Sequence, residues 1–543
     1  MKLSVERLPP DALLPSDFAR AMIAGGSSLE GLCLPRSLKD LPLPDERFTP
    51  DERKVLAARL EERLTALAPP VAVLDSVRAL ATPGAFAVIA GQQPGLLSSP
   101  LLSFHKALHA IRLARALSQA WECPVVPIFW NHGDDHDIAE VHHTYLPNEN
   151  LDLRKVRLAG LSSGRQPVSR LLLSEERNHL AALRSLLQQT LGNEPHAEQA
   201  LELCMPVEGD SLVTAFTRSL TRILGPLGLV VLEPDWIRDD LSRALADVVS
   251  AGPAGPLEQG SADLRTAGLA PLIDPLDAAL VYRVDAGGRH ALRSGGDGFR
   301  YADEPGSRTS AELAAEIVGD LDSFSAGALL RPVVQDLCLP TAAYVGGWAE
   351  LAYHAQLLPL RRAVGAPLTP VVPRMSCTLV EPDVARSLAK LEVSARDVIE
   401  GRGELELEQG AGDRPAVLDD LERVAEEAAA SMLALKPGLT AIDRSLAQNV
   451  ARVARQVRDQ IGKLGAKAER VHANQSGKGE RHLRRTRNAL APRGELQERV
   501  LGPLTLIARY GTSWVDALFE HLAPLEDGHL IATIQTDEAE GDS

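Results

Sequence analysis

The sequence predicts an α/β protein with a parallel-sheet core, followed by a helical coiled-coil region. Two short apolar runs, 85–90 and 124–130, lack polar alternation, which is typical of strands covered by helices on both faces. A segment with helical spacing of apolar residues lies between these runs. Helical patterns dominate from about residue 380, and one of them carries a near-heptad seam.

Composition limits the class of protein. The chain has 543 residues, enough for two or three domains, and its hydrophobic content of 45% supports a sizeable core. The net charge of −16 argues against nucleic-acid binding. Neither an 18-residue apolar run nor a signal-like N-terminus is present, so we expect no membrane association. The five cysteines are widely spaced, which favours reduced thiols and a cytoplasmic location.

The most informative stretch, 85–137, reads as strand, glycine-rich turn, helix and strand. Gly91 to Gly95 form the turn, and glycine allows the backbone to approach a ligand closely. His105 and Lys106 lie about one turn into the helix, near its positive end, which favours anions such as phosphate. The spacing matches neither the dinucleotide fingerprint nor a Walker loop. An ordinary tight turn with a solvated lysine is the alternative.

A polar cluster follows the second strand directly. It consists of His132, Asp134, Asp135, His136 and Asp137. Parallel strands bind ligands at their carboxyl ends, so this cluster and the glycine-rich turn are expected to share one crevice. Such a dense group implies shifted pKa values, a bound cation or partners from elsewhere. We interpret it as catalytic or substrate-binding. A zinc or manganese site extended by His142 and His143, and a simple helix cap, are the alternatives.

Other segments complete the expected core up to residue 380. In chain order they are a mostly helical region 1–80, a helical insertion 150–225, a strand within 228–235, an antiparallel insertion 265–325, a strand 340–347 and a short strand 368–373. The strand 340–347 ends in Gly346 and Gly347, and the strand 368–373 leads to Arg374.

The expected helical domain spans 381–500, and a helical segment 501–543 returns to the core. Its seam needs a partner helix, either in the chain or in a second subunit, and comprises Leu446, Val450, Val453, Val457, Ile461, Leu464, Ala468 and Val471. Residues 474–480 are expected to form a loop. The segment 463–493 carries nine Lys or Arg against two Glu. It forms either a solvated face or a surface that attracts a polyphosphate or acidic ligand.

Several motifs together resemble the bacillithiol biosynthesis cysteine-adding enzyme family. They are Gly-Gln-Gln-Pro-Gly-Leu-Leu (91–97) with His105-Lys106, Pro-Ile-Phe-Trp (127–130), Gly-Asp-Asp-His-Asp (133–137), the segment 331–347, Val-Val-Pro-Arg-Met (371–375), 490–499 and Arg-Tyr-Gly (509–511). The resemblance spans nearly the whole chain. Asp134 departs from the glutamate usual in the family, Trp348 from the usual proline, and Asn131-His132 from small or apolar residues.

The resemblance implies a Rossmann-like core related to nucleotidyltransferases and class I synthetases, with residues 1–380 forming that core. It also implies a coiled-coil domain that supports a homodimer, and a nucleotide pocket between the two. The implied catalytic residues are His105, Lys106, Asp135, His136 and Asp137. The implied substrate- or nucleotide-binding residues are Gly91, Gln92, Gln93, Gly95, Asn131, Asp134, Gly346, Gly347, Glu350, Tyr353, Arg374, Gln497, Arg499, Arg509 and Tyr510.

The implied reaction joins the carboxyl group of L-cysteine to the amine of glucosaminyl-malate. This reaction is uphill from a free carboxylate, so ATP is the expected energy source, giving ADP or another product nucleotide. His136, or an aspartate beside it, would accept the amine proton, and His105 or Lys106 would stabilise charge on the activated group. The need for a metal stays open. The alternatives are a metal-dependent hydrolase or phosphoesterase and a nucleotide-binding coiled-coil scaffold.

Overall fold

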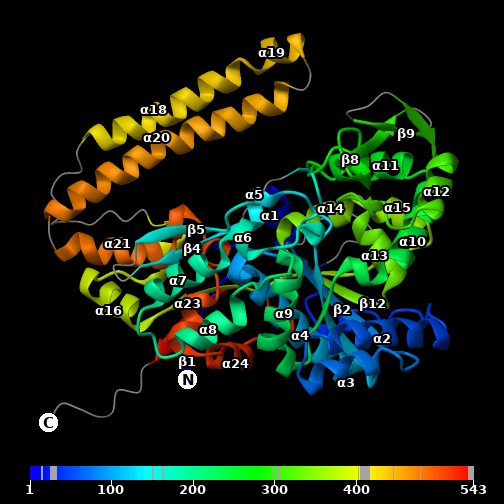
Figure 1. Ribbon diagram of the computed structural model, residues 1–543, viewed down its shortest axis with the longest axis horizontal. Helices are drawn as coiled ribbons and strands as arrows, with labels where there is room; N and C mark the ends of the chain where they lie inside the picture. The colour runs from blue at the N-terminus through cyan, green and yellow to red at the C-terminus, as the bar shows by residue number, and fades with distance from the viewer. Residues whose placement is uncertain are drawn as a thin grey trace. The chain divides into compact units, whose positions relative to one another are not determined.

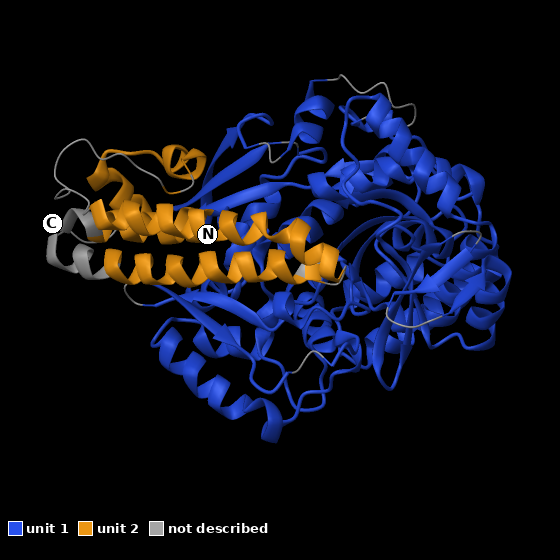
Figure 2. Cartoon of the chain, turned by 90° about the horizontal axis from the view of Figure 1, so that it is seen from above, with its two compact units in different colours: residues 1–382, 495–543 blue, residues 383–494 orange. Residues whose placement is uncertain are grey.

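A computed structural model describes residues 1–13, 16–24, 34–148, 152–161, 164–295, 298–302, 306–401, 403, 416–443, 446–476, 478–526 and 528–535. The chain forms two compact units (Figure 2). The first comprises Met1–Pro382 and Glu495–Ser543, and the second comprises Asp383–Gly494. The second unit is therefore an insertion between two parts of the first.

A five-stranded, fully parallel sheet forms the centre of the first unit (Figure 1) and confirms the predicted fold class. In spatial order its strands are β13 (Val371–Pro373), β12 (Thr341–Gly346), β2 (Phe86–Gln92), β3 (Val125–Asn131) and β6 (Val230–Leu232). The chain passes from β2 through β3 to β6 and later returns to β12 on the other side of β2. The sheet therefore has a switch point between β2 and β12, where α/β proteins bind ligands.

Helices cover both faces of this sheet, as the unbroken apolar runs predict. Alternate residues of β2 join two separate cores: Phe86 and Val88 belong to the core that contains α4, whereas Ala87 and Ile89 belong to the core that contains residues of α2 and α3. The helix α4 (Leu101–Trp121) is buried on nearly all sides. The other helices of the first unit up to residue 250 are α1 (Asp17–Ile23), α2 (Pro50–Thr65), α3 (Val71–Ala79), α5 (Ile138–Val141), α6 (Glu175–Asn178), α7 (Leu180–Leu191), α8 (Ala197–Cys204), α9 (Leu212–Leu224) and α10 (Arg238–Ser250).

The other helices of this unit follow residue 250. They are α11 (Ala254–Thr266), α12 (Ser310–Gly319), α13 (Arg331–Cys338), α14 (Trp348–Gln356), α15 (Leu358–Ala363), α22 (Gln497–Val500), α23 (Leu504–Tyr510) and α24 (Ser513–Glu520). Across the described residues, no helix is both long enough and apolar enough to cross a membrane.

A second sheet corrects two expectations. Its order is β1 (Lys2–Leu8), β15 (His529–Gln535) and β14 (Ser376–Val380). The N-terminal region was expected to be mostly helical and the last segment helical, and helices do form in both, but each also contributes a strand that was not expected. The strand β1 pairs antiparallel with β15, from Lys2 opposite Gln535 to Leu8 opposite His529. The charged β1 sequence carries little strand signal by itself, and its partner lies at the far end of the chain.

The expected antiparallel excursion is confirmed as a five-stranded sheet. Its order is β10 (Ser307–Thr309), β9 (Gly298–Tyr301), β8 (Gly288–Gly295), β7 (Ala279–Asp285) and β11 (Phe324–Ala326). The insertion expected to be helical over 150–225 is only partly so, because β4 (His143–Pro147) and β5 (Leu153–Arg157) form a hairpin before its helices begin.

Helices are the only regular secondary structure in the described residues of the second unit. Its helices are α16 (Pro382–Leu391), α17 (Ala395–Glu400), α18 (Ala416–Ala434), α19 (Lys436–Ile442), α20 (Leu446–Ser476) and α21 (Lys478–Leu490). The helix α20 packs along α18 of the same chain (Figure 1). On its seam Val450 is buried, whereas Leu464 is 56% exposed. The loop expected at 474–480 is wrong for most of its length, since α20 continues to Ser476 and α21 begins at Lys478.

Candidate active site

A buried ion pair joins the two strands that flank the switch point. Lys106, on α4, donates to the carbonyl oxygen of Gly91 (2.9 Å) and to Oε1 of Gln92 (3.2 Å), and it pairs with Glu350 at the start of α14. Burial lowers the pKa of Lys106 despite the favourable charge of Glu350. These contacts engage all three ammonium protons, so Lys106 fixes the turn after β2 rather than presenting a free charge.

Glu350 is the centre of this arrangement. Its carboxylate accepts from the hydroxyl of Tyr344 (2.7 Å) and from the backbone N–H of Gly347 (2.8 Å). The glycine pair ends β12, and Glu350 three residues later reaches back to cap α14. Burial raises the pKa of Glu350, but Lys106 and Gly347 lower it by more, so the carboxylate stays ionised.

The start of α4, where the sequence suggested an anion site, follows a tight turn and is partly engaged within the protein. The turn from Gly95 to Ser99 is tight, and a Cβ atom at Gly95 would lie 1.8 Å from the carbonyl oxygen of Ser99. The N–H of Leu101 donates to the carbonyl oxygen of Leu501 (2.8 Å). Glycine is therefore needed here for the turn itself, and the first N–H group of the helix is engaged within the protein.

His105 lies in the core, not beside Lys106 at the strand ends. Its Nδ1 is 2.6 Å from the carboxylate of Glu498, on α22, and both side chains have no solvent exposure. Glu498 also accepts from Nη2 of Arg374 (2.6 Å), from Oγ of Ser376 (2.9 Å) and from the N–H of Cys377 (3.0 Å). Burial raises the pKa of Glu498, yet Arg374 and His105 bring it well below its usual value.

Asp135 and His136 come together with the turn after β2. The amide of Gln93 donates to Asp135 (2.6 Å), and Nη1 of Arg289 lies 3.2 Å from the same carboxylate and 3.1 Å from Nδ1 of His136. The Arg289 guanidinium also stacks on the ring of Tyr282, 3.7 Å from its centroid. Burial raises the pKa of Asp135, but His136 and Arg289 lower it far more. Asp135 is therefore ionised at any physiological pH.

The remaining members of the polar cluster separate. Asp134 forms an ion pair with Arg238, and Asp137 caps α5 through the N–H of Ala139 (3.0 Å). Asn131 is fully buried and donates to the carbonyl oxygen of Val213 (3.0 Å) and to Thr217 (2.9 Å). Throughout the described ranges, no group of three or more His, Cys, Asp or Glu side chains has the arrangement of a metal site.

Four residues of the C-terminal motifs are not part of the strand-end site. Three of them make contacts that hold other segments together, and one is exposed. Gln497 pairs with both backbone groups of Leu379 in β14 (2.9 Å each). Arg509 binds Glu194 and Glu381, and the Tyr510 hydroxyl donates to Glu381 (3.1 Å). Arg499 is exposed.

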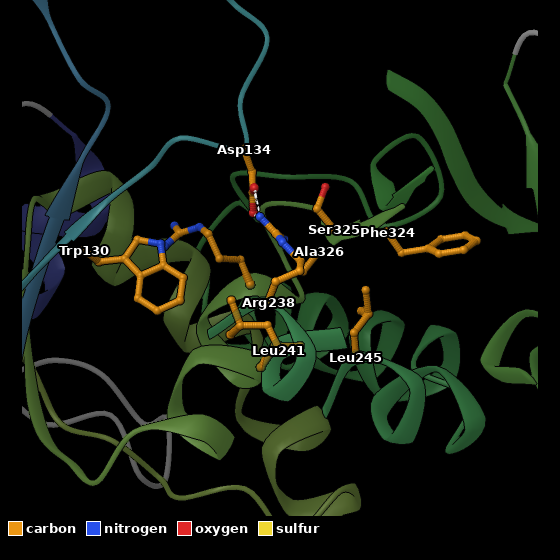
Figure 3. A pocket seen from close by; sticks show the side chains of 10 residues that line it. Trp130, Asp134, Arg238, Leu241, Leu245, Phe324, Ser325 and Ala326 are labelled. Carbon is orange, nitrogen blue, oxygen red and sulfur yellow. Dashed lines mark hydrogen bonds and ion pairs between the residues drawn. The ribbon is translucent and has the colours of Figure 1, made fainter. Parts of the chain in front are cut away.

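The strand-end site is therefore Gly91–Gln93, Lys106, Asp135, His136 and Glu350. Beside it lies a small pocket lined by Trp130, Asp134, Arg238, Leu241, Leu245, Phe324, Ser325, Ala326, Arg331 and Val334 (Figure 3). Tyr353, on α14, accepts from Nη2 of Arg331 (3.1 Å). Sequence reasoning missed Arg289, Arg331 and Glu498. The last two lie in motifs that carried the family resemblance, whereas no local signal distinguishes Arg289.

Buried histidines predict a loss of stability in mild acid. Burial lowers the pKa of His109 and His529 to about 4, and it lowers those of His132 and His354 well below the usual value. The unfolded chain then binds more protons than the folded chain below pH 6.5. Stability should fall as the pH drops from about 6.5 to 4, and His109 and His529 should each cost about 2 kcal/mol by pH 5.

Urea unfolding between pH 7.5 and 5 checks this expectation. His529→Gln should flatten the pH dependence, whereas His179→Asn, at an exposed histidine with left-handed backbone geometry, should leave it unchanged. A free energy of unfolding that stays constant down to pH 5 would contradict it.

Comparison with known proteins places the chain in a family. Residues 39–375 match the model for the N-terminal Rossmann-like domain of bacillithiol biosynthesis BshC, and residues 377–534 match the model for its C-terminal coiled-coil domain. A "Putative cysteine ligase BshC" from Koribacter versatilis is 33% identical over 488 residues, covering 87% of this chain and 88% of that protein.

Further relatives carry the same description. One from Symbiobacterium thermophilum is 33% identical over 508 residues (88% of this chain, 89% of the relative), and one from Geobacillus thermodenitrificans is 30% identical over 475 residues (85% and 87%). A solved structure titled "putative arginyl t-RNA synthetase" from Campylobacter jejuni aligns at 10% identity with a TM-score of 0.22. The alignment covers 79% of this chain and 92% of that one, and a likeness this weak carries no argument. The matches to both domain models, together with relatives similar over most of their length, establish that this chain belongs to the bacillithiol biosynthesis BshC family.

Proposed function

We propose that this protein is a ligase of bacillithiol biosynthesis that joins the carboxyl group of L-cysteine to the amine of glucosaminyl-malate. The names of its relatives support a cysteine ligase. The observation that carries the proposal is the strand-end site, where the ionised Asp135 and the adjacent His136 lie after β3, next to the turn of β2 that Lys106 fixes. Ligands of open α/β sheets bind at this edge.

We propose ATP as the co-substrate, because amide formation from a free carboxylate is uphill in water. Two N–H groups at the site suit a phosphate or carboxylate oxygen: Nε of Arg289 and Nη1 of Arg331 are buried and have no hydrogen-bond partner among the described residues. ATP supplies carboxyl activation. Arg289 and Arg331 would hold the anionic groups that take part, a role that the sequence suggested for His105 and Lys106.

The amide-forming step makes a bond between the amine nitrogen and the carboxyl carbon of cysteine. The activated oxygen leaves with its phosphate or nucleotide, and the amine loses a proton. Asp135 is suited to attract the amine because it stays ionised. In the neutral His136 ring, Nδ1 accepts from Arg289, so Nε2 carries the proton. The ring can accept the amine proton only at Nδ1, once that atom is released from Arg289. Asp135 is the weaker acceptor, because its pKa is held far below the usual value.

The test is to incubate the purified protein with cysteine, glucosaminyl-malate and ATP and to detect the amide-linked thiol by mass spectrometry. Asp135→Asn and His136→Gln should each lower the rate about 100-fold or more, the usual effect of losing acid–base catalysis. Asp240→Asn, which removes a partly exposed carboxylate paired with Arg59, is the control and should behave like the wild type. Failure of the wild-type protein to form product with ATP would overturn the proposal.

A metal-dependent hydrolase has less support. Asp134, Asp135 and Asp137 contact three different partners, namely Arg238, Arg289 with Gln93, and the N-terminus of α5. Stoichiometric metal and phosphoesterase activity in the purified protein would restore this alternative.

We also propose that the protein forms a homodimer through the α18–α20 hairpin. This hairpin leaves Val424, Leu433 and Leu464 between 43% and 56% exposed. Analytical ultracentrifugation of the wild type and of Leu464→Lys tests the proposal, and a dimer that persists unchanged in the variant would contradict it.

A further inference from the structure

The pocket beside the strand-end site is lined by apolar side chains together with a few polar ones. Figure 3 shows Trp130 at one end and Phe324 at the other, with Leu241 and Leu245 along one side. These side chains come from the end of β3, from β11 and from α10. The pocket adjoins the strand-end site through Asp134, the immediate neighbour of Asp135.

Two hydrogen-bond donors of this pocket are buried without a partner. Nη1 of Arg331 and Oγ of Ser325 contact no acceptor within the part of the chain that the structure describes. Ser325 is only 4% exposed. Leaving a buried polar group unsatisfied costs about 1–3 kcal/mol, more for a charged group, so such groups mark a place where a ligand supplies the missing partner.

The two guanidinium groups of the pocket differ in their partners. Of its two guanidinium groups, that of Arg238 is neutralised by ion pairs with Asp134 and Asp235. Arg331 uses Nη2 to donate to the Tyr353 hydroxyl, and the Glu350 carboxylate acts on its charge only at longer range. Among the described residues, Arg331 is therefore the pocket's guanidinium without a carboxylate in direct contact. A guanidinium and a hydroxyl that line the same pocket are donors that match the oxygens of a carboxylate.

We infer that this pocket is a subsite for a substrate carboxylate, with Arg331 as the charged anchor and Ser325 as the second donor. The inference rests on the proposed function for the identity of the substrates. Two sources have the same chemistry: the carboxylate of L-cysteine and the malate carboxylates of glucosaminyl-malate. The apolar walls contact the carbon skeleton that carries the carboxylate.

Arg331 is a specificity residue in this scheme, and its loss has a distinct kinetic signature. Arg331→Gln should raise the KM for one of the two substrates about 10- to 100-fold, as expected for a lost hydrogen bond to a charged group, and change the other KM much less. Arg331→Lys should recover part of the loss, because lysine restores the charge without the planar pair of donors. Arg243→Gln removes an exposed arginine from α10 and is the matched control.

Ser325→Ala keeps the test valid if Arg331→Gln folds poorly. The alanine variant should raise the same KM about 3- to 10-fold. Its thermal stability should stay at the wild-type level or rise, because the hydroxyl has no partner to lose. A purely structural role would instead lower stability or kcat and leave both KM values unchanged, and that result would overturn the inference.

Direct binding separates the sources and the two proposals. Isothermal titration calorimetry measures binding without catalytic turnover. The ligands are L-cysteine, L-malate and glucosaminyl-malate, and glucosamine, which lacks the malate part, is the comparison. If Arg331→Gln weakens cysteine binding alone, the subsite holds cysteine. If it weakens malate and glucosaminyl-malate but spares glucosamine, the subsite holds the malate part. If Arg331→Gln weakens binding in either way but the wild-type protein forms no amide product, the carboxylate subsite is supported and the proposed ligase reaction is rejected. Equal binding of every ligand by wild type and Arg331→Gln, or no binding by the wild type, rejects the subsite.

Discussion

Glu498→Ala is expected to lower the free energy of unfolding by about 3–5 kcal/mol, the usual cost of removing one partner from a buried charged network. The substitution leaves the guanidinium of Arg374 without its carboxylate in a site where both side chains are buried. It also removes the acceptor for Ser376, for the N–H of Cys377 and for His105. Urea unfolding at pH 7.5 measures the effect.

A nearby glutamate gives the matched control for that experiment. Glu495 is exposed and lies three residues before Glu498, so Glu495→Ala should change the free energy of unfolding by less than about 0.5 kcal/mol. A loss below about 1 kcal/mol for Glu498→Ala would show that the network contributes little to stability. Adding Arg374→Met to Glu498→Ala should recover part of the loss, because no buried charge is then left unpaired.

Lys106→Met should lower ligase activity at least about 100-fold, since the turn of Gly91 and Gln92 loses its fixed position and small displacements are costly at a reactive site. It also leaves Glu350 as a buried, unpaired carboxylate, and the expected loss of stability is about 3–5 kcal/mol. The same measurements on Lys54→Met, at an exposed lysine, give the control.

The double variant Lys106→Met, Glu350→Gln separates structure from chemistry. Neutralising both partners should recover much of the stability that Lys106→Met loses, because a neutral pair has no desolvation cost to offset. Activity should stay low, because Gly91 and Gln92 remain without the ammonium group that holds them. Recovery of activity together with stability would mean that Lys106 and Glu350 serve the fold alone.

The sequence predicted the parts of this fold whose signals are local. The runs of β2 and β3 are apolar throughout because both faces are covered, and α4 between them has clear helical spacing. The strand β1 could not be found in the same way, because its partner β15 lies more than 500 residues away and its own residues alternate weakly. The pairing of strands so far apart in the sequence cannot be detected from the pattern of a few neighbouring residues.

The site shows the same division. Sequence placed Asp135, His136 and the Gly91 turn at neighbouring strand ends, and the structure brings these groups together. The sequence could not show that His105 and Lys106 have different surroundings. The helix α4 is buried on nearly all sides, so His105 faces Glu498 whereas Lys106 faces Glu350. Arg289 and Arg331 reach the site from an antiparallel insertion and from α13, so their contacts depend on tertiary packing alone.

The His105–Glu498 contact has a consequence for how the protein is made. The two residues are 393 positions apart, so the ribosome completes Glu498 about 20–80 s after His105, at the usual 5–20 residues per second. During that interval the nascent first unit lacks α22 and β15, and apolar surface and unpaired strand edges that they later cover remain accessible. Synthesis of this protein should therefore depend on chaperones that hold the incomplete unit until its final strand emerges.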